Sequence, residues 1–218
     1  MQATLLLLSA ATKCDNYNYL HLLSGQCFPI KSQKQIHSFF ESKSDQFVAV
    51  NDFTQHEKTI KYRVNFIHLG LELGDYRNNF FLKILRKFVL LVQYPFNFFT
   101  GKKESFHYGS QWFSITNDFA KHLVDNKQSL LKKYRWALCP DEIFVQTELM
   151  NNIESYSKAE KGNYRYIDWA GCKNSPRTLV MNDYESLIAS DALFARKFDQ
   201  NIDSEIIIYF SKILSDCK

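Results

Sequence analysis

Short apolar runs typical of β-strands alternate along this chain with segments at helical spacing. The strand pattern occurs at residues 17–24, 47–50 and 61–67, and the first of these runs reads as a central strand. Between the first two, Ser32 and Gln35 match a capping box, which predicts a short helix through Phe40. The order strand, helix, strand predicts an α/β fold with a crossover connection.

The rest of the chain continues this alternation. Residues 2–12 predict a buried helix, and Phe28 with Pro29 predicts a turn. Further strands are predicted at 108–116 and 164–169, and further helices at 118–124, capped by Asn117, at 140 to about 155, at 183–189 and from 203 onward. No internal repeat or linker interrupts the order, so we expect residues 1–218 to form a single domain.

Composition excludes several classes of protein. The 218 residues include 19 Phe, 12 Tyr and 3 Trp, too many aromatic side chains for a disordered chain, and only 7 Gly and 4 Pro. A net charge of +4 is mild, so no nucleic-acid partner is expected. Five cysteines without a CxxC pair argue against a zinc site or a disulfide framework and favour a reducing, cytoplasmic location.

Residues 80–92 have two interpretations. Apolar residues recur there at helical spacing, with basic residues between them: Phe81, Ile84, Leu85, Phe88 and Val92, and Lys83, Arg86 and Lys87. The pattern favours a helix packed on the core with a solvated rim, ended by the stretch from Tyr94-Pro95 to Gly101. The alternative is a basic amphipathic helix that contacts a membrane peripherally or a lipid-linked substrate. No run reaches the roughly 18 apolar residues of a membrane span.

Asp141 and Glu142 are the first candidates for chemistry. Neighbours in a helical first turn point about 100° apart, so the two carboxylates cannot face each other as a glycosidase pair does. One of them alone suits a general base, because a helix N-terminus favours the ionised form. By residue type alone, helix capping is the favoured interpretation.

Basic and aromatic residues supply the other candidates. Arg177 follows Ser175-Pro176, and Lys197 follows Arg196 within an aromatic-flanked segment, as phosphate-binding groups do, although solvated surface cations have the same pattern. Trp112, Tyr166 and Trp169 suit stacking on sugar rings or packing in a core. Asp-x-Asp, GxGxxG and P-loop motifs are absent, so no metal site and no bound cofactor are predicted.

Six segments together carry a resemblance. They are His21–Ser32, Tyr108–Thr116, Cys139–Glu142, Arg165–Trp169, Ser175–Arg177 and Phe194–Asp199. This collinear series resembles the core-2/I-branching β-1,6-N-acetylglucosaminyltransferase family, which includes the peptide O-xylosyltransferases, and is most similar to its bacterial members. Residues 54–103 match poorly.

The resemblance implies a variant of the nucleotide-sugar transferase A-type fold, a mixed sheet flanked by helices. It implies an inverting, metal-independent enzyme that moves N-acetylglucosamine, or xylose, from a UDP-sugar to a hydroxyl of a glycan or polysaccharide acceptor. It assigns the catalytic base to Glu142 and the diphosphate-binding pair to Arg177 and Lys197. It places acceptor contacts at Tyr166, Asp168 and Trp169.

Two departures from the family pattern keep an alternative open. The family motif has Gly-Gln-Asp where this chain has Cys27 in place of the aspartate. The resemblance also implies that the chain lacks an N-terminal strand–helix unit and covers about the C-terminal two thirds of the catalytic region. The alternative is therefore a non-catalytic truncated remnant or a glycan-binding module of the same family.

Overall fold

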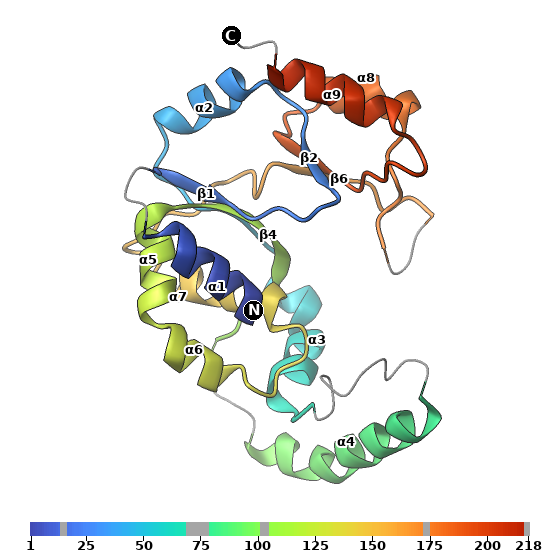
Figure 1. Ribbon diagram of the computed structural model, residues 1–218. Coiled ribbons are helices and arrows are strands. Elements are labelled where there is room, and N and C mark those ends of the chain that lie inside the picture. The colour runs from blue at the N-terminus through green and yellow to red at the C-terminus, as the bar shows by residue number, and fades with distance from the viewer. Residues whose placement is uncertain (14–16, 69–78, 101–104, 172–174, 216–218) are drawn as a thin grey trace.

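The computed structural model describes residues 1–13, 17–68, 79–100, 105–171 and 175–215. Within them the chain forms α-helices and two small β-sheets, which confirms the α/β class. The helices are α1 (Gln2–Ala11), α2 (Gln33–Glu41), α3 (Phe53–Asn65), α4 (Phe80–Thr100), α5 (Asn117–Asp125), α6 (Lys127–Lys133), α7 (Phe144–Asn151), α8 (Tyr184–Ala189) and α9 (Glu205–Ser215), with 3-10 turns η1 (Pro140–Glu142) and η2 (Met181–Asp183). Figure 1 shows the two sheets in the upper part of the molecule and α4 at its lower end.

The first sheet has the order β1-β4-β3 and is built around β4 (Gly109–Thr116). β1 (Tyr19–His21) and β3 (Phe47–Val50) both pair antiparallel with β4, so they run parallel to each other on its two sides. The strands predicted at 47–50 and 108–116 are thereby confirmed. The central position predicted for residues 17–24 is wrong, because β1 lies at the edge of the sheet that the described residues form.

The two faces of β4 bury different partners. Phe113 and Ile115 join the main hydrophobic cluster with side chains of α1, α3, α5 and α7. Trp112 and Ser114 point the other way, toward the second sheet, where they contact Arg196 and Arg165. The alternation of a β-strand thus places Phe113 and Ile115 toward the helices, and it places Trp112 and Ser114 toward two arginines of the second sheet.

The second sheet has the order β2-β6-β5 and mixes both pairings. β6 (Phe194–Arg196) pairs antiparallel with β2 (Cys27–Pro29) and parallel with β5 (Arg165–Ile167). α8 and α9 bury Leu187, Ile206 and Phe210 against one face of it. The turn predicted at Phe28-Pro29 is wrong: these residues belong to strand β2.

Local capping signals set several helix boundaries as predicted. The capping box of Ser32 and Gln35 is formed at the start of α2. α5 begins one residue earlier than predicted, because the Thr116 hydroxyl accepts the hydrogen bond from the amide of Phe119. The helix predicted from 140 to about 155 divides into η1 and α7.

The strand predicted at residues 61–67 is wrong, because most of this segment belongs to α3. The alternation of apolar and polar residues there fits either structure over so short a run. Ile60 and Val64, four residues apart, are both buried in the main cluster, so helical spacing decides the outcome.

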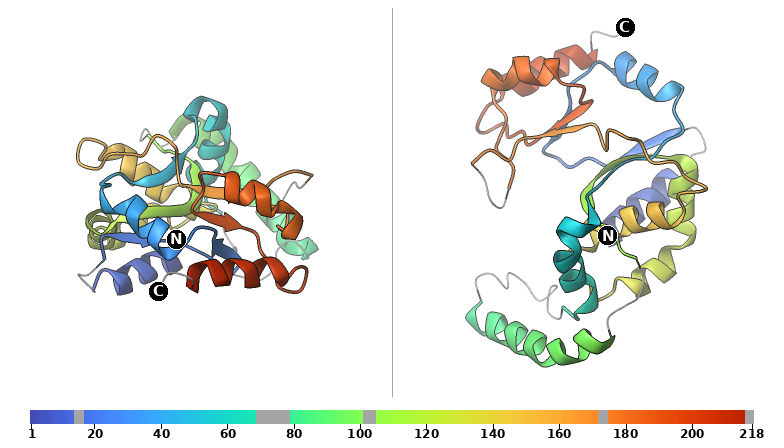
Figure 2. Two further views of the ribbon diagram at one scale, coloured as in Figure 1. Left: turned by 90° about the horizontal axis from the view of Figure 1, so that it is seen from above. Right: turned by 180° about the vertical axis from the view of Figure 1, so that it is seen from behind.

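The favoured interpretation of residues 80–92 is also wrong. The helix is present as α4 and continues through Pro95 to Thr100, but its apolar residues are not packed on the core. Phe81, Phe88 and Leu91 are 80%, 62% and 72% exposed. Figures 1 and 2 show α4 at the end of the molecule, away from both sheets.

Gly109, where the chain enters β4, is required by a close backbone approach. A Cβ atom at this position would lie 1.8 Å from the carbonyl oxygen of Ala49 on β3. We therefore expect Gly109→Ala to lower the free energy of unfolding by roughly 1–3 kcal/mol, measured by urea unfolding.

Gly25→Ala is the matched control, since no atom lies within 4 Å of its Cβ position. It should change stability by less than about 0.5 kcal/mol. Equal stability of the two variants would contradict the packing described at β4.

Candidate active site

Glu142 lies at the end of a short turn fixed by backbone geometry. Cys139 adopts a left-handed conformation with φ 47°, and Pro140 then occupies the first position of η1. The buried side chains of Ile143 and Phe144 anchor the turn to the main cluster. The Glu142 side chain is left 30% exposed, so its carboxylate is accessible from solvent.

The Glu142 carboxylate is paired with Arg63 of α3. The guanidinium NH1 donates a short hydrogen bond to Glu142 Oε2, and the Arg63 carbon Cζ lies 4.9 Å from the centre of the Tyr108 ring. Burial lowers the pKa of Arg63, but the Glu142 carboxylate outweighs it and the net direction is upward. Burial and the Glu142 charge raise the pKa of Tyr108.

This pairing decides what Glu142 can do chemically. The Arg63 guanidinium holds the Glu142 carboxylate in place, and the exposed part of that carboxylate can accept a proton from a bound ligand. Sequence reasoning missed Arg63 because the segment that carries it was predicted to be a strand. A helical assignment would have placed a cation on α3, but only the fold brings it to Glu142.

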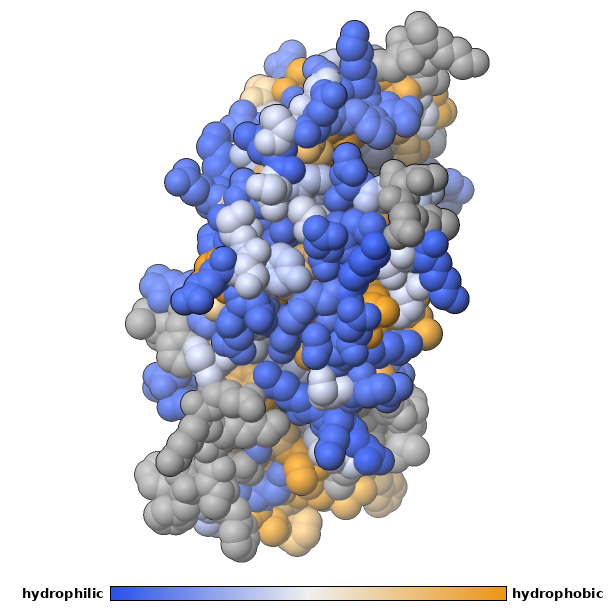
Figure 3. Space-filling model, turned by 90° about the vertical axis from the view of Figure 1, so that its left-hand side faces the viewer, coloured by the Kyte–Doolittle hydropathy of each residue, from blue (hydrophilic) through white to orange (hydrophobic). Residues whose placement is uncertain are grey.

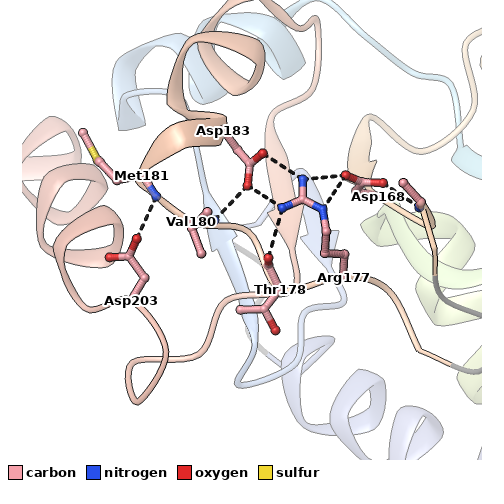
Figure 4. Close-up of polar contacts among 8 residues, drawn as sticks. Asp168, Arg177, Thr178, Val180, Met181, Asp183 and Asp203 are labelled. Atoms are coloured by element: carbon pink, nitrogen blue, oxygen red, sulfur yellow. Dashed lines mark hydrogen bonds and ion pairs between the residues drawn. The ribbon is translucent and has the colours of Figure 1, made fainter.

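Arg177 is held between two aspartates, as Figure 4 shows. Its Nε and NH2 groups donate to Asp168 Oδ2 at 2.9 and 2.6 Å, and NH1 and NH2 donate to the two Asp183 oxygens at 2.9 and 2.7 Å. NH1 also donates to the carbonyl oxygen of Thr178 at 3.4 Å. All five guanidinium donors are thus engaged.

Both aspartates that contact Arg177 have lowered pKa values. The Ala170 amide and the Arg177 guanidinium hold the pKa of Asp168 below its ordinary value. Arg177 does the same for Asp183, against the opposing effect of burial. The structure therefore brings together Arg177 and Asp168, two predicted site residues, and adds Asp183, which from sequence alone resembles an ordinary helix-start residue.

Lys197 lies where two of the resembling segments, His21–Ser32 and Phe194–Asp199, meet the stretch that follows Arg177. Its carbonyl oxygen accepts a hydrogen bond from the Leu179 amide at 2.8 Å, and the next amide, of Phe198, donates to the Gln26 carbonyl at 2.9 Å. The Lys197 side chain is half-buried, and its ammonium forms no ion pair with any residue that the structure describes. Within the described residues, no carboxylate therefore compensates its charge. No contact among the described residues joins it to Glu142.

Cys27, which replaces the aspartate of the family motif, lies directly opposite Arg196 across the β2–β6 pair. Arg165, on the same face of this sheet, donates to the Phe113 carbonyl and the Ser114 hydroxyl. Burial lowers the pKa of Arg165 to about 9. Neither arginine is paired with a carboxylate in the part of the chain that the structure covers. A counterion is therefore missing at the position where the family motif has an acid.

The predicted acceptor residues have different environments. Tyr166 packs partly buried against the cluster under α8 and α9. Asp168 is occupied by Arg177. Trp169 is 54% exposed, so its indole ring is available to a ligand.

A separate pocket of about 810 Å³ lies between α2, β1 and β6. It is lined by aromatic and polar side chains that include Tyr19, His21, Lys34, Phe40 and Phe194, and by none of the predicted site residues. His21 Nδ1 lies 2.7 Å from Ser114 Oγ. Burial and the Arg165 charge lower the pKa of His21 to about 4, so its ring is neutral near pH 7.

The described residues provide neither a metal site nor a membrane-spanning helix. Among them no group of three or more His, Cys, Asp or Glu side chains is arranged to hold a metal ion. None of the helices that they form combines the length and the apolarity needed to cross a bilayer.

Comparison with known proteins agrees with the resemblance. The family model described as "Branch: Core-2/I-Branching enzyme" matches residues 1–189. Xylosyltransferase 2 of Homo sapiens is 28% identical over 120 residues, which cover 45% of this chain and 14% of that protein. The Bos taurus protein of the same name is 31% identical over 120 residues, and xylosyltransferase 1 of Mus musculus is 28% identical over 128 residues. The chain therefore spans 13–14% of the length of these relatives.

The contact of Arg177 with Asp168 and Asp183 predicts a pH-dependent contribution to stability. Because the pKa of each aspartate is lowered in the folded chain, the contribution is present above their ordinary pKa of about 3.9 and is lost as the pH falls through the lowered values. Urea unfolding should show Arg177→Gln to be less stable than the unchanged chain at about pH 7, with a difference that becomes smaller below about pH 3.

Arg135→Gln is the matched control, since Arg135 lies over the Trp136 ring. Its effect on stability should not vary with pH in this range. A constant destabilisation by Arg177→Gln down to the lowest pH would contradict the ion pairs.

Proposed function

Because the chain belongs to the Core-2/I-branching enzyme family, whose fold is a variant of the nucleotide-sugar transferase A-type, we propose that it is an inverting, metal-independent glycosyltransferase. It moves N-acetylglucosamine, or xylose, from a UDP-sugar to a hydroxyl of a glycan or polysaccharide acceptor. The names of the matched relatives, xylosyltransferases 1 and 2, support the reaction class.

The observation that carries this proposal is the accessible, ion-paired carboxylate of Glu142. A base in this reaction must be held within reach of the acceptor hydroxyl, and the Arg63 guanidinium fixes the position of the partly exposed Glu142 carboxylate. Glu142 takes the proton from the acceptor hydroxyl while the hydroxyl oxygen attacks the anomeric carbon. The bond from that carbon to the diphosphate breaks, and its electron pair leaves with UDP.

Lys197 is the cation best placed to stabilise the leaving diphosphate. Its ammonium has no carboxylate partner among the described residues, so it can supply positive charge without first breaking an ion pair. Arg177 fills the same role only if Asp168 or Asp183 releases part of its guanidinium. The exposed ring of Trp169 suits stacking on an acceptor sugar, with Tyr166 and Asp168 near it in sequence.

The remaining parts of the proposal concern location and partners. We infer a cytoplasmic protein that contacts a membrane peripherally through residues 80–92. Its partners are a UDP-sugar and a glycan acceptor, with neither a nucleic acid nor a resident cofactor.

A second candidate function is a glycan-binding remnant without transferase activity. Two observations favour it: the engagement of every Arg177 donor by the chain itself, and the absence of an acid at position 27 beside Arg165 and Arg196. Such a protein would retain sugar contacts at Trp169 but would not bind the diphosphate.

Glu142→Gln tests the base. The substitution preserves shape but removes the group that takes the proton, so we expect transfer to fall by about 10²- to 10⁴-fold with unchanged circular dichroism. The measurement is acceptor-dependent release of UDP from UDP-N-acetylglucosamine and UDP-xylose.

Asp141→Asn is the control for this experiment, because it removes the neighbouring carboxylate and should leave most of the activity. Full turnover by Glu142→Gln would exclude Glu142 as the base.

Lys197→Ala tests the diphosphate site. Titration calorimetry with UDP in excess EDTA should show binding that weakens by roughly 10- to 100-fold in the variant, because a charge-assisted hydrogen bond contributes about 1.5–3 kcal/mol.

Lys34→Ala is the matched control, since Lys34 lines the separate pocket. Its affinity for UDP should equal that of the unchanged chain. A loss confined to Lys34→Ala would place UDP in that pocket, and no binding by a folded chain would favour the glycan-binding remnant.

A further inference from the structure

Helix α4 presents a continuous apolar surface to solvent. We define its outward face as the exposed apolar residues Phe81, Ile84, Leu85, Phe88, Leu91 and Val92. At about 100° per residue they fall within an arc of about 120° on one side of the helix. Figure 3 shows apolar side chains gathered at the lower end of the molecule, whereas the surface above is mainly hydrophilic.

The opposite side of α4 is fastened to the body of the protein. Arg86 NH2 lies 3.3 Å from Nδ1 of the buried His68, and the Gln93 side chain accepts from the Ile67 amide at 2.7 Å and donates to the Ile67 carbonyl at 3.2 Å. Arg86 and Gln93 lie within about 20° of each other around the helix, nearly opposite the outward face. The apolar side is therefore held outward by contacts on the polar side.

The positive charges on α4 favour a partner with a negatively charged surface. The helix contains Lys83, Arg86 and Lys87 and no Asp or Glu between Phe80 and Thr100. Lys83 and Lys87 are exposed and lie on the same side of the outward face, Lys87 about 40° and Lys83 about 80° beyond its edge at Leu91. A second copy of the chain docked through this face would bring like charges together, whereas an anionic surface would be attracted.

We propose that the outward face of α4 docks on an anionic lipid bilayer, with the helix axis in the plane of the interface. Apolar side chains then enter the boundary between headgroups and acyl chains, while Lys83 and Lys87 remain at the level of the lipid phosphates and carboxylates. This deepens the peripheral membrane contact of the proposed function by naming the lipid charge and the residues that meet it.

Docking in this way also determines where the candidate active site lies relative to the bilayer. His68 Nε2 donates to the carbonyl oxygen of Tyr62 on α3, the helix that carries Arg63 and thus holds Glu142. A chain of named contacts therefore connects the bilayer-facing helix to the carboxylate. The docked protein therefore holds the Arg63–Glu142 pair in a fixed position relative to the bilayer surface.

Flotation with vesicles tests the proposal without any need for turnover. The whole chain should float with phosphatidylcholine vesicles that contain phosphatidylserine and should remain in the dense fraction with phosphatidylcholine alone. Phe81→Ser combined with Phe88→Ser should abolish flotation. Lys83→Gln combined with Lys87→Gln should weaken it roughly thirtyfold, since each lysine near an anionic surface contributes about a fivefold factor.

Matched variants elsewhere on the surface serve as controls. Lys34→Gln with Lys43→Gln removes the same charge, and Leu6→Ser with Leu7→Ser removes exposed apolar side chains from α1. Both should float like the unchanged chain. Equal losses in the controls, no flotation by the folded chain, or a dimer in sedimentation that the two Phe→Ser changes dissociate would each overturn the proposal. Loss of docking with intact transfer would leave the transferase function standing.

Discussion

Strand β4 is the constraint on which the rest of the structure depends. It pairs with both other strands of its sheet, and one face of it joins the helices of the main cluster. On its other face the Ser114 hydroxyl accepts from Arg165 and lies 2.7 Å from His21, which ties the second sheet to the first. The strand begins at Gly109, where the backbone passes so close to Ala49 that no side chain fits. Tyr108, just before it, reaches the Arg63–Glu142 pair.

The charged residues of the candidate site differ in how fully other residues of the protein neutralise them. Glu142 is compensated by one arginine and remains accessible, whereas two aspartates and the Thr178 carbonyl engage every donor of Arg177. Lys197, the other cation of the predicted pair, has no carboxylate partner among the residues that the structure describes. This distribution fits the proposed transferase, in which an ion pair positions the base and Lys197 is the first cation to contact the diphosphate. It also leaves Arg177 as a support of the loop around Asp168 unless a ligand competes for it.

Local signals in the sequence predicted much of the fold, and tertiary packing decided the rest. The capping box at Ser32 and the strand of 108–116 depend on neighbouring residues, so both were found. The segment around Arg63 has the apolar–polar alternation of a strand. Only the burial of Ile60 and Val64 on one helical face shows that it is a helix. Helical spacing predicted α4 but could not show which side meets the body. Asp183 resembles an ordinary helix-start residue until the fold places Arg177 against it.

We propose that a UDP-sugar binds beside Lys197, where the segment after Arg177 runs along the end of β6. Hydrogen–deuterium exchange, with and without UDP in excess EDTA, tests this location most directly. Binding at Lys197 should slow exchange in peptides that cover residues 177–180 and 194–199. Slower exchange confined to residues 17–41, the segment that supplies most of the lining of the pocket of about 810 Å³, would contradict this location.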